Sequence, residues 1–126
     1  MTIDFLPDRP IYLQLIDRIC SEIVRGERQL GEKLDSVRDF AVETGVNANT
    51  IQRVYRELEQ MQITETKRGQ GTFVTTDKKR LQQLREEMKS KYIEAFLNDM
   101  NELGFTVNEM IAGIEKLYNR EGNERD

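Results

Sequence analysis

Polar side chains with the chemistry to hydrogen-bond to DNA base edges share one face of a predicted helix. Asn49, Gln52, Arg53 and Arg56 follow the spacing i, i+3, i+4 and i+7, which brings side chains together on a helix. An Asn or Gln amide can bond to N6 and N7 of adenine, and an Arg guanidinium to O6 and N7 of guanine. Recognition helices contact bases with their first residues. We therefore predict that Asn49, Thr50 and Gln52 lie deepest, with Arg56 nearer the backbone.

Two further segments carry groups that suit a phosphate backbone. Arg38 is predicted in the first turn of a preceding helix, where free N–H groups and the helix dipole attract phosphate. Arg68 and Gly69 lie, with Lys67, in a predicted turn between two strands. A basic turn of this kind can rest on phosphates or enter the minor groove, and a glycine there allows close approach of the backbone.

Each of these features also has a purely structural explanation. An ordinary solvated helix face would carry the same polar residues, with Asn47 only capping the helix. A surface ion pair with Asp35 or Asp39 would account for Arg38. A tight turn requires glycines such as Gly69 without any ligand. The residues alone leave these alternatives open.

Composition excludes most catalytic chemistry. The chain has 126 residues, no His and one Cys, which excludes His-based catalysis, catalytic triads, His- or Cys-cluster metal sites and an intramolecular disulfide. No apolar run approaches the ~20 residues of a membrane span, and Asp4 and Asp8 are untypical of a signal peptide. We expect a cytoplasmic protein that is not an enzyme and needs no cofactor or metal.

Net charge argues against nucleic acid as a partner, but the distribution of charge does not. The chain carries −4 from 19 Lys+Arg and 23 Asp+Glu, whereas DNA-binding domains are usually basic. Residues 44–56 nevertheless contain two Arg and no acidic residue, and residues 67–80 contain five basic residues and one acidic residue, Asp77. A locally basic face is therefore compatible with the acidic chain.

Caps and hydrophobic spacing predict the elements that hold these groups. Pro10 opens a helix that Gly26 stops, Ser36 caps a second that ends at Gly45, and Asn47 caps a third that runs to about Gln60. Residues 27–35 between the first two helices are predicted as a loop. Two β-branched runs, 63–67 and 72–75, follow as a hairpin. This order predicts a winged helix-turn-helix domain over residues 9–77.

Beyond this domain, an apolar stripe predicts a long helix that Gly104 ends and a shorter helix that Thr106 and Glu109 begin as a capping box. Two helices with single apolar faces bury too little surface alone, so they must pack on the winged domain, on a second copy of the chain or on both. Self-association is the simplest outcome, and we predict a homodimer formed by residues 78–119, followed by a charged, frayed tail at 120–126. Lys78, Lys79 and Arg80 are interpreted as solvated linker charges, with phosphate contact as the alternative. The predicted dimer contacts are Leu81, Leu84, Met88, Tyr92, Phe96, Met100 and Leu103.

Four ordered blocks of the chain resemble the GntR family of bacterial transcription regulators. They are RPIYLQL at 9–15, GEKLDSVRDFA at 31–41, VNANTIQRVYRELE at 46–59 and RGQGTFV at 68–74. The short C-terminal part, with SVR and NxNTxQR, resembles the YtrA subfamily. This resemblance implies a mainly α fold with a small β-hairpin, and a cytoplasmic homodimer that usually represses operons, often of ABC transporters. It also implies that Arg38 and Gly69 contact DNA.

Two positions depart from the family pattern and leave the operator sequence open. Asp35 stands where the family usually has Pro, and Ala48 stands where many members have Arg or Pro. The fifty C-terminal residues are too few to enclose the ~300–1,000 Å³ of a usual ligand pocket, so only a cavity shared between subunits could hold a small-molecule effector.

Two functions remain in competition at this point. The first is a dimeric repressor that binds a palindromic operator, with half-sites about one helical turn, or a multiple of it, apart. The second is a winged-helix adaptor that binds protein through its apolar stripes, which the acidic pI of about 5.0 favours.

Overall fold

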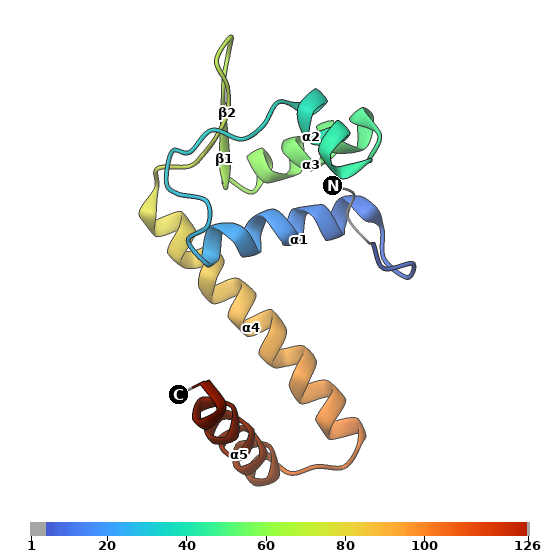
Figure 1. Ribbon diagram of the computed structural model, residues 1–126, viewed down its shortest axis with the longest axis vertical. Helices are drawn as coiled ribbons and strands as arrows, with labels where there is room; N and C mark the ends of the chain where they lie inside the picture. Colours follow the sequence, from blue (N-terminus) through green and yellow to red (C-terminus); the bar gives the residue numbers. More distant parts are fainter. Residues whose placement is uncertain (1–4, 126) are drawn as a thin grey trace. The chain divides into compact units, whose positions relative to one another are not determined.

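The computed structural model describes residues 5–125, which form five helices and one antiparallel hairpin (Figure 1). Contacts along the chain divide it into two compact units, one ending at Glu86 and the other beginning at Glu87. The first unit contains three helices, the hairpin and the start of the fourth helix. The rest of the fourth helix, with the fifth, makes up the second unit. The predicted fold, mainly helical with a small hairpin, is confirmed.

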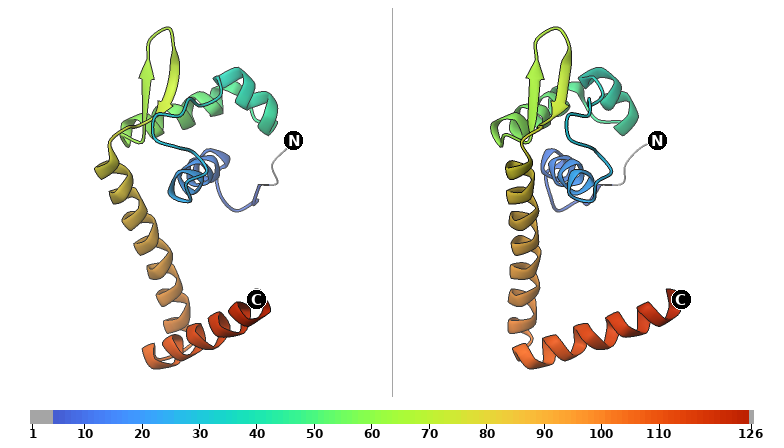
Figure 2. Two further views of the ribbon diagram at one scale, coloured as in Figure 1. Left: turned by 60° about the vertical axis from the view of Figure 1, so that its left-hand side comes forward. Right: turned by 90° about the vertical axis from the view of Figure 1, so that its left-hand side faces the viewer.

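The core of the first unit lies where α1 (Ile11–Val24) packs against α3 (Ala48–Gln60) (Figure 2). α1 spans Ile11–Val24 and begins directly after Pro10, whose missing N–H costs nothing at a helix start. Its buried face follows the predicted helical spacing. The buried residues of α1 are Leu15, Ile16, Ile19, Cys20 and Ile23.

Local capping fixes the two helices of the helix-turn-helix. α2 spans Val37–Thr44, and the Ser36 Oγ accepts a hydrogen bond from the Asp39 N–H at 3.1 Å. Gly45 ends the helix with φ of +70°, the left-handed conformation that glycine adopts readily. α3 spans Ala48–Gln60, and the Asn47 Oδ1 accepts from the Asn49 N–H at 2.7 Å. The two predicted N-caps, Ser36 and Asn47, and the predicted helix end at Gly45 are all confirmed.

The wing contains more backbone pairing than the two predicted strands. β1 (Thr64–Lys67) and β2 (Gly71–Val74) pair antiparallel, with Thr64 opposite Val74. The segment before α2, predicted as a plain loop, pairs with the other edge of β2. There the Leu34 N–H donates to the Thr72 carbonyl, and the Val74 N–H donates to the Glu32 carbonyl, both at 2.8 Å. Such long-range pairing has no local sequence signal.

The first turns of α4 belong to the first unit. α4 spans Lys78–Glu102 and is capped by the Asp77 carboxylate. The interpretation of Arg80 as a solvated linker charge is wrong, because its Nε donates to the Met61 carbonyl at 2.8 Å. Arg85 donates in turn to the Val24 carbonyl at 3.1 Å, and Leu84 is buried. These contacts join the start of α4 to the ends of α1 and α3.

α5 begins as predicted and continues further than predicted. It spans Val107–Arg125, and Thr106 and Glu109 exchange the two backbone-to-side-chain bonds of a capping box at 3.1 and 3.2 Å. The prediction of a frayed tail at 120–126 is wrong for the described part, because the helix continues to Arg125. The apolar stripe ends before this tail, but no proline or strong turn signal ends the helix. Within residues 5–125, every helix is too short or too polar to span a lipid bilayer.

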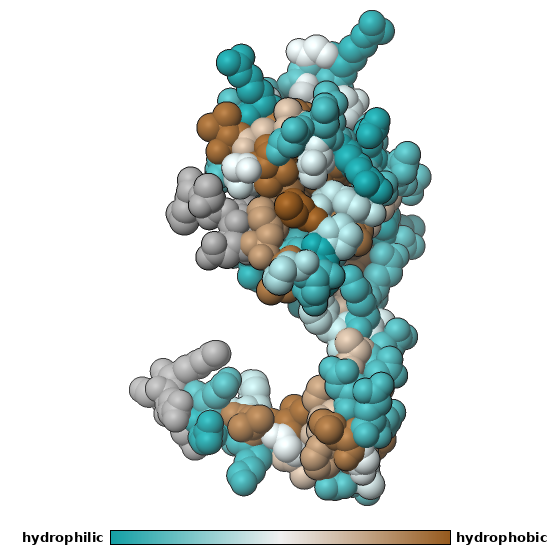
Figure 3. Space-filling view, turned by 90° about the vertical axis from the view of Figure 1, so that its right-hand side faces the viewer, coloured by the Kyte–Doolittle hydropathy of each residue, from teal (hydrophilic) through white to brown (hydrophobic). Residues whose placement is uncertain are grey.

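The second unit leaves much apolar surface exposed. Met110 is buried, whereas most other large apolar side chains of α5 are about half exposed. Figure 3 shows hydrophobic residues gathered over these C-terminal helices. The most exposed apolar residues of this unit are Tyr92, Leu103, Val107, Ile111, Ile114, Leu117 and Tyr118.

Candidate nucleic-acid interface

α3 presents its apolar and polar residues on opposite sides. Ile51, Val54 and Leu58 are fully buried against the rest of the first unit. The side chains predicted to contact bases lie on the other side, where Thr50 is half-buried. Those exposed to solvent are Asn49, Gln52, Arg53 and Arg56. The side-chain amides of Asn49 and Gln52 can therefore hydrogen-bond to a ligand without any rearrangement of the core.

Arg38 lies exposed in the first turn of α2. Among the residues that the structure describes, neither Asp35 nor Asp39 forms an ion pair with it, so the ion-pair explanation for this residue is not supported. The Asp39 N–H is bonded to Ser36, and the Arg38 guanidinium remains available for a phosphate.

The tip of the wing is open and depends on glycine. Gly69 has φ of +78°, and the following Gln70 N–H donates to the Lys67 carbonyl at 2.8 Å, as in a type II turn. A Cβ added at Gly69 would have no atom within 4 Å. The positive φ that this turn requires is thus sufficient to explain why the residue is a glycine. The free space around Gly69 also leaves room for another molecule. Arg68 beside it is exposed to solvent on this tip.

The arginines of this face differ in pairing from the other arginines of the first unit. Within residues 5–125, Arg38, Arg53, Arg56 and Arg68 have no carboxylate within 4.0 Å. A phosphate-binding surface requires such free cations. The other arginines of the first unit each bond to a carboxylate or to a backbone carbonyl. The carboxylate pairs are Arg9 with Asp17, Arg18 and Arg28 with Glu22, and Arg25 with Glu27. The carbonyl pairs are Arg80 with Met61 and Arg85 with Val24.

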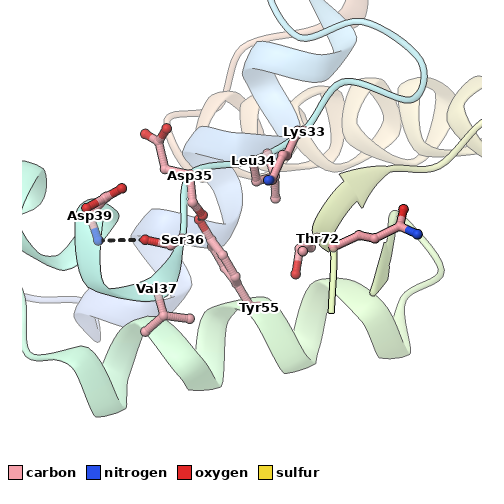
Figure 4. A pocket seen from close by; sticks show the side chains of 10 residues that line it. Lys33, Leu34, Asp35, Ser36, Val37, Asp39, Tyr55 and Thr72 are labelled. Carbon is pink, nitrogen blue, oxygen red and sulfur yellow. Dashed lines mark hydrogen bonds between the residues drawn. The ribbon is translucent and has the colours of Figure 1, made fainter. Parts of the chain in front are cut away.

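A hollow of about 540 Å³ separates the start of α2 from the wing (Figure 4). Ser36 borders it on one side, Gln70 and Thr72 on the other, and Tyr55 of α3 forms part of its wall. The Tyr55 hydroxyl donates to the Asp35 carbonyl at 2.7 Å, which fixes the chain just before α2. The first turn of α2 and the wing therefore flank one concave surface.

Because of Tyr55, the free energy of unfolding should change with pH in the alkaline range. Burial raises the pKa of the Tyr55 hydroxyl above the ordinary value of about 10. The folded protein thus holds this proton more tightly than the unfolded chain, so the free energy of unfolding falls as pH rises above about 10. Tyr55→Phe should remove that fall, and should cost ~0.5–1.5 kcal/mol at pH 7 through the lost hydrogen bond.

Urea unfolding at pH 7 and at pH 11, at one protein concentration, measures both effects. A fall of equal size in wild type and in Tyr55→Phe between the two pH values would contradict the assignment.

A residue that sequence reasoning did not find is Tyr12 of α1. The Arg53 guanidinium carbon lies 3.6 Å from the centroid of the Tyr12 ring, a cation–π contact between α3 and α1. Lys67 is held in the same way over Phe73, at 4.9 Å. The two residues of each contact come from different elements, so no local pattern indicates them.

The predicted dimer contacts divide between the two units. Leu84 is buried within the first unit and Leu81 is half-buried there, so Leu84 has no surface left for a partner. Of the others, Met88 and Met100 are half-buried. The more exposed members, all in the second unit, are Tyr92, Phe96 and Leu103. The sequence places all these side chains on one apolar stripe. In the structure, some of them are buried within their own unit and others are exposed to solvent.

Comparison with known proteins agrees with this architecture. A family model described as bacterial regulatory proteins, gntR family, matches residues 11–74. The uncharacterised HTH-type transcriptional regulator YhcF of Bacillus subtilis is 45% identical over 111 residues, 88% of this chain and 92% of YhcF. The HTH-type transcriptional repressor YtrA of the same bacterium is 34% identical over 99 residues, 74% of this chain and 76% of YtrA.

A solved structure extends the likeness to three dimensions. A GntR family transcriptional regulator from Listeria monocytogenes superposes with a TM-score of 0.85 and 41% identity, covering 89% of this chain and 98% of that one. Both the winged domain and the helices that follow it are therefore shared. The chain belongs to the GntR family of DNA-binding transcriptional regulators, of the YtrA type, which are not enzymes.

Proposed function

We propose that this regulator is a homodimeric repressor that reads a palindromic operator. One observation carries the DNA-reading part: the exposed amides of α3 lie among arginines that have no carboxylate partner in the described chain. Asn49, Thr50 and Gln52 contact bases, and Arg56 lies nearer the backbone. Arg38, Arg68 and the Gly69 backbone contact phosphates. Residues 9–77 form the DNA-binding domain.

The apolar surface of the second unit supports the homodimer. Side chains such as Ile114 and Leu117 are more than half exposed in a single chain, and a contiguous apolar patch of this kind marks an interaction site. A second copy offers the same patch, which a two-fold axis would bring face to face. In this proposal residues 78–119 form the dimerisation segment, with its contact surface on the second unit, and residues 120–126 are a charged tail.

Repression is proposed from the relative YtrA, which is named a repressor, and a transporter-type operon is proposed from resemblance to its subfamily. Such a protein acts in the cytoplasm, where the DNA is. Two-fold symmetry then places the half-site centres ~34–36 Å apart, or at a multiple of that distance.

Fluorescence anisotropy with the DNA upstream of the protein's own gene tests the proposal. We expect tight binding that weakens steeply as salt rises, because phosphate contacts release counterions. A scrambled duplex of equal length and composition should bind at least ~10³-fold more weakly at the same salt. DNase footprinting of the preferred duplex would then locate the half-sites.

Equal and weak binding to both duplexes would contradict specific recognition at this site. A genome-wide selection of bound fragments with the purified protein would decide whether another sequence is preferred. If no fragment is enriched, the adaptor function, which the net charge of −4 favours, becomes the better explanation.

A further inference from the structure

The contact between Arg53 and Tyr12 joins the exposed face of α3 to a helix outside the helix-turn-helix. Tyr12 lies in the first turn of α1 and is half-buried, while Arg53 is exposed in the middle of α3. Their separation of 3.6 Å between guanidinium carbon and ring centroid is well inside the ~6 Å range of a cation–π contact. The ring therefore restricts where this arginine can point.

Stacking leaves the hydrogen-bonding capacity of Arg53 intact. A guanidinium stacks through its flat face, whereas its N–H donors lie in its plane. No carboxylate of residues 5–125 lies within 4.0 Å of Arg53. The donors are thus oriented, but free to bond to another molecule.

The position of the ring decides which part of DNA Arg53 can meet. A guanidinium resting on α1 is drawn toward the flank of α3, whereas the shorter amides of Asn49 and Gln52 are exposed and have no such contact within residues 5–125. In a helix docked in the major groove, the base edges lie below the helix and the phosphates lie along its flanks. The stacked position therefore favours a phosphate over a base edge.

We propose that Arg53 binds a backbone phosphate and that Tyr12 is the positioning residue that holds it there. This inference rests on the proposed DNA-binding function and assigns Arg53 a role different from base readout. Holding the guanidinium in place before binding lowers the entropy lost when the contact forms. Lys67 makes the same kind of cation–π contact with Phe73 on the wing, so two cations of this face are each held by an aromatic ring.

Binding to a random-sequence duplex at low salt tests the proposal without knowledge of the operator. Arg53→Ala should weaken this binding and lower the slope of log K against log salt by about 1.8, because a homodimer loses one phosphate contact, worth about 0.9, from each subunit. Tyr12→Leu should weaken it about two- to tenfold. Tyr12→Phe, which keeps the ring, should bind like wild type.

A double-mutant cycle shows whether Tyr12 acts through Arg53. In the Arg53→Ala background, Tyr12→Leu should have no further effect, because no guanidinium remains to be positioned. Thermal unfolding of each variant checks that the fold is kept. Should Tyr12→Leu fail to fold, NMR of the wild type and of Tyr12→Phe provides a second test, since stacking should shift the Arg53 side-chain protons upfield in both.

Three results would overturn the inference. The first is a loss in Arg53→Ala confined to the upstream duplex with an unchanged salt slope, which would make Arg53 a base reader. The second is an equal loss from Tyr12→Leu with and without Arg53. The third is an unshifted Arg53 spectrum. Failure of the proposed function is distinguishable in the wild type. Equal binding to both duplexes would contradict specific recognition and leave the test of Arg53 and Tyr12 on random DNA intact, whereas binding to neither duplex would overturn the proposed function and this inference together.

Discussion

Alanine at both Asn49 and Gln52 should reduce operator affinity to the level of random DNA. Each amide that bonds to a base in two places discriminates by ~1–3 kcal/mol, and a homodimer makes each contact in both half-sites. Even the lower figure gives ~4 kcal/mol for the four contacts, which corresponds to a loss of about 10³-fold. Fluorescence anisotropy with the operator and a scrambled duplex measures this loss directly.

The same substitutions should leave the fold and the nonspecific affinity unchanged. Both side chains are exposed, and surface substitutions of this kind usually change stability by less than ~0.5 kcal/mol. Although the Asn49 N–H takes part in the Asn47 cap, that N–H belongs to the backbone and survives the change to alanine. Binding to random DNA rests on the arginines, so its salt slope should not change.

A matched control comes from α4. Gln83→Ala with Asn101→Ala removes the same two side-chain types from exposed positions away from the helix-turn-helix, and this variant should bind the operator like wild type. If the Asn49/Gln52 variant still prefers the operator as strongly as wild type does, these residues do not read the sequence, and the assignment of α3 as the recognition helix is wrong.

Placing glutamate at Ile114 and Leu117 should convert the protein to a monomer. These side chains are 53% and 54% exposed in the single chain and lie three residues apart on α5. Their burial in a dimer would force each glutamate to lose its hydration without a partner charge, which is strongly unfavourable. Light scattering of the purified variant should therefore give half the mass of wild type.

Loss of the dimer should weaken operator binding much more than binding to an isolated half-site. In a dimer, the second half-site is bound at a high effective concentration, which raises avidity by about 10²–10⁴-fold. The monomeric variant should lose that factor on a duplex with both half-sites and should keep wild-type affinity for one half-site. Titration of both duplexes separates an effect on dimerisation from damage to the DNA-binding domain.

The control adds the same charge to another side of α5. Asn108→Glu with Asn119→Glu introduces two negative charges at exposed positions off the apolar stripe. This variant should remain dimeric and bind the full operator normally. A dimeric mass for the Ile114/Leu117 variant would place the contact between subunits elsewhere on the chain.

The elements of this fold could be predicted because their signals are local. Ser36, Asn47 and the Thr106–Glu109 box each satisfy backbone groups within three residues of themselves, so a short stretch of sequence contains the whole interaction. The apolar spacing of α1 and α3 likewise follows from the helical repeat. The exposed face of α3 could be predicted for the same reason, because the side chains opposite the buried stripe of a helix face solvent.

Contacts between distant segments could not be predicted in this way. Pairing of residues 32–34 with β2, the bond from Arg80 to Met61 and the stacking of Arg53 on Tyr12 join positions between 19 and 42 residues apart. A side chain such as arginine fits a salt bridge, a carbonyl or an aromatic ring equally well by type. Which partner it meets depends on the path of the backbone between the two.

The sequence by itself therefore determined the family, the order of elements and the face that carries amides and arginines, since each depends on residue type and short-range spacing. Tertiary structure alone decided how those groups are held. It placed Arg53 on an aromatic ring, paired the other arginines of the first unit outside the face and left Arg38, Arg56 and Arg68 without a carboxylate partner among residues 5–125. It also buried Leu84 while leaving Ile114 exposed on a similar stripe, because burial depends on what packs opposite a helix, which the helix's own residues do not specify.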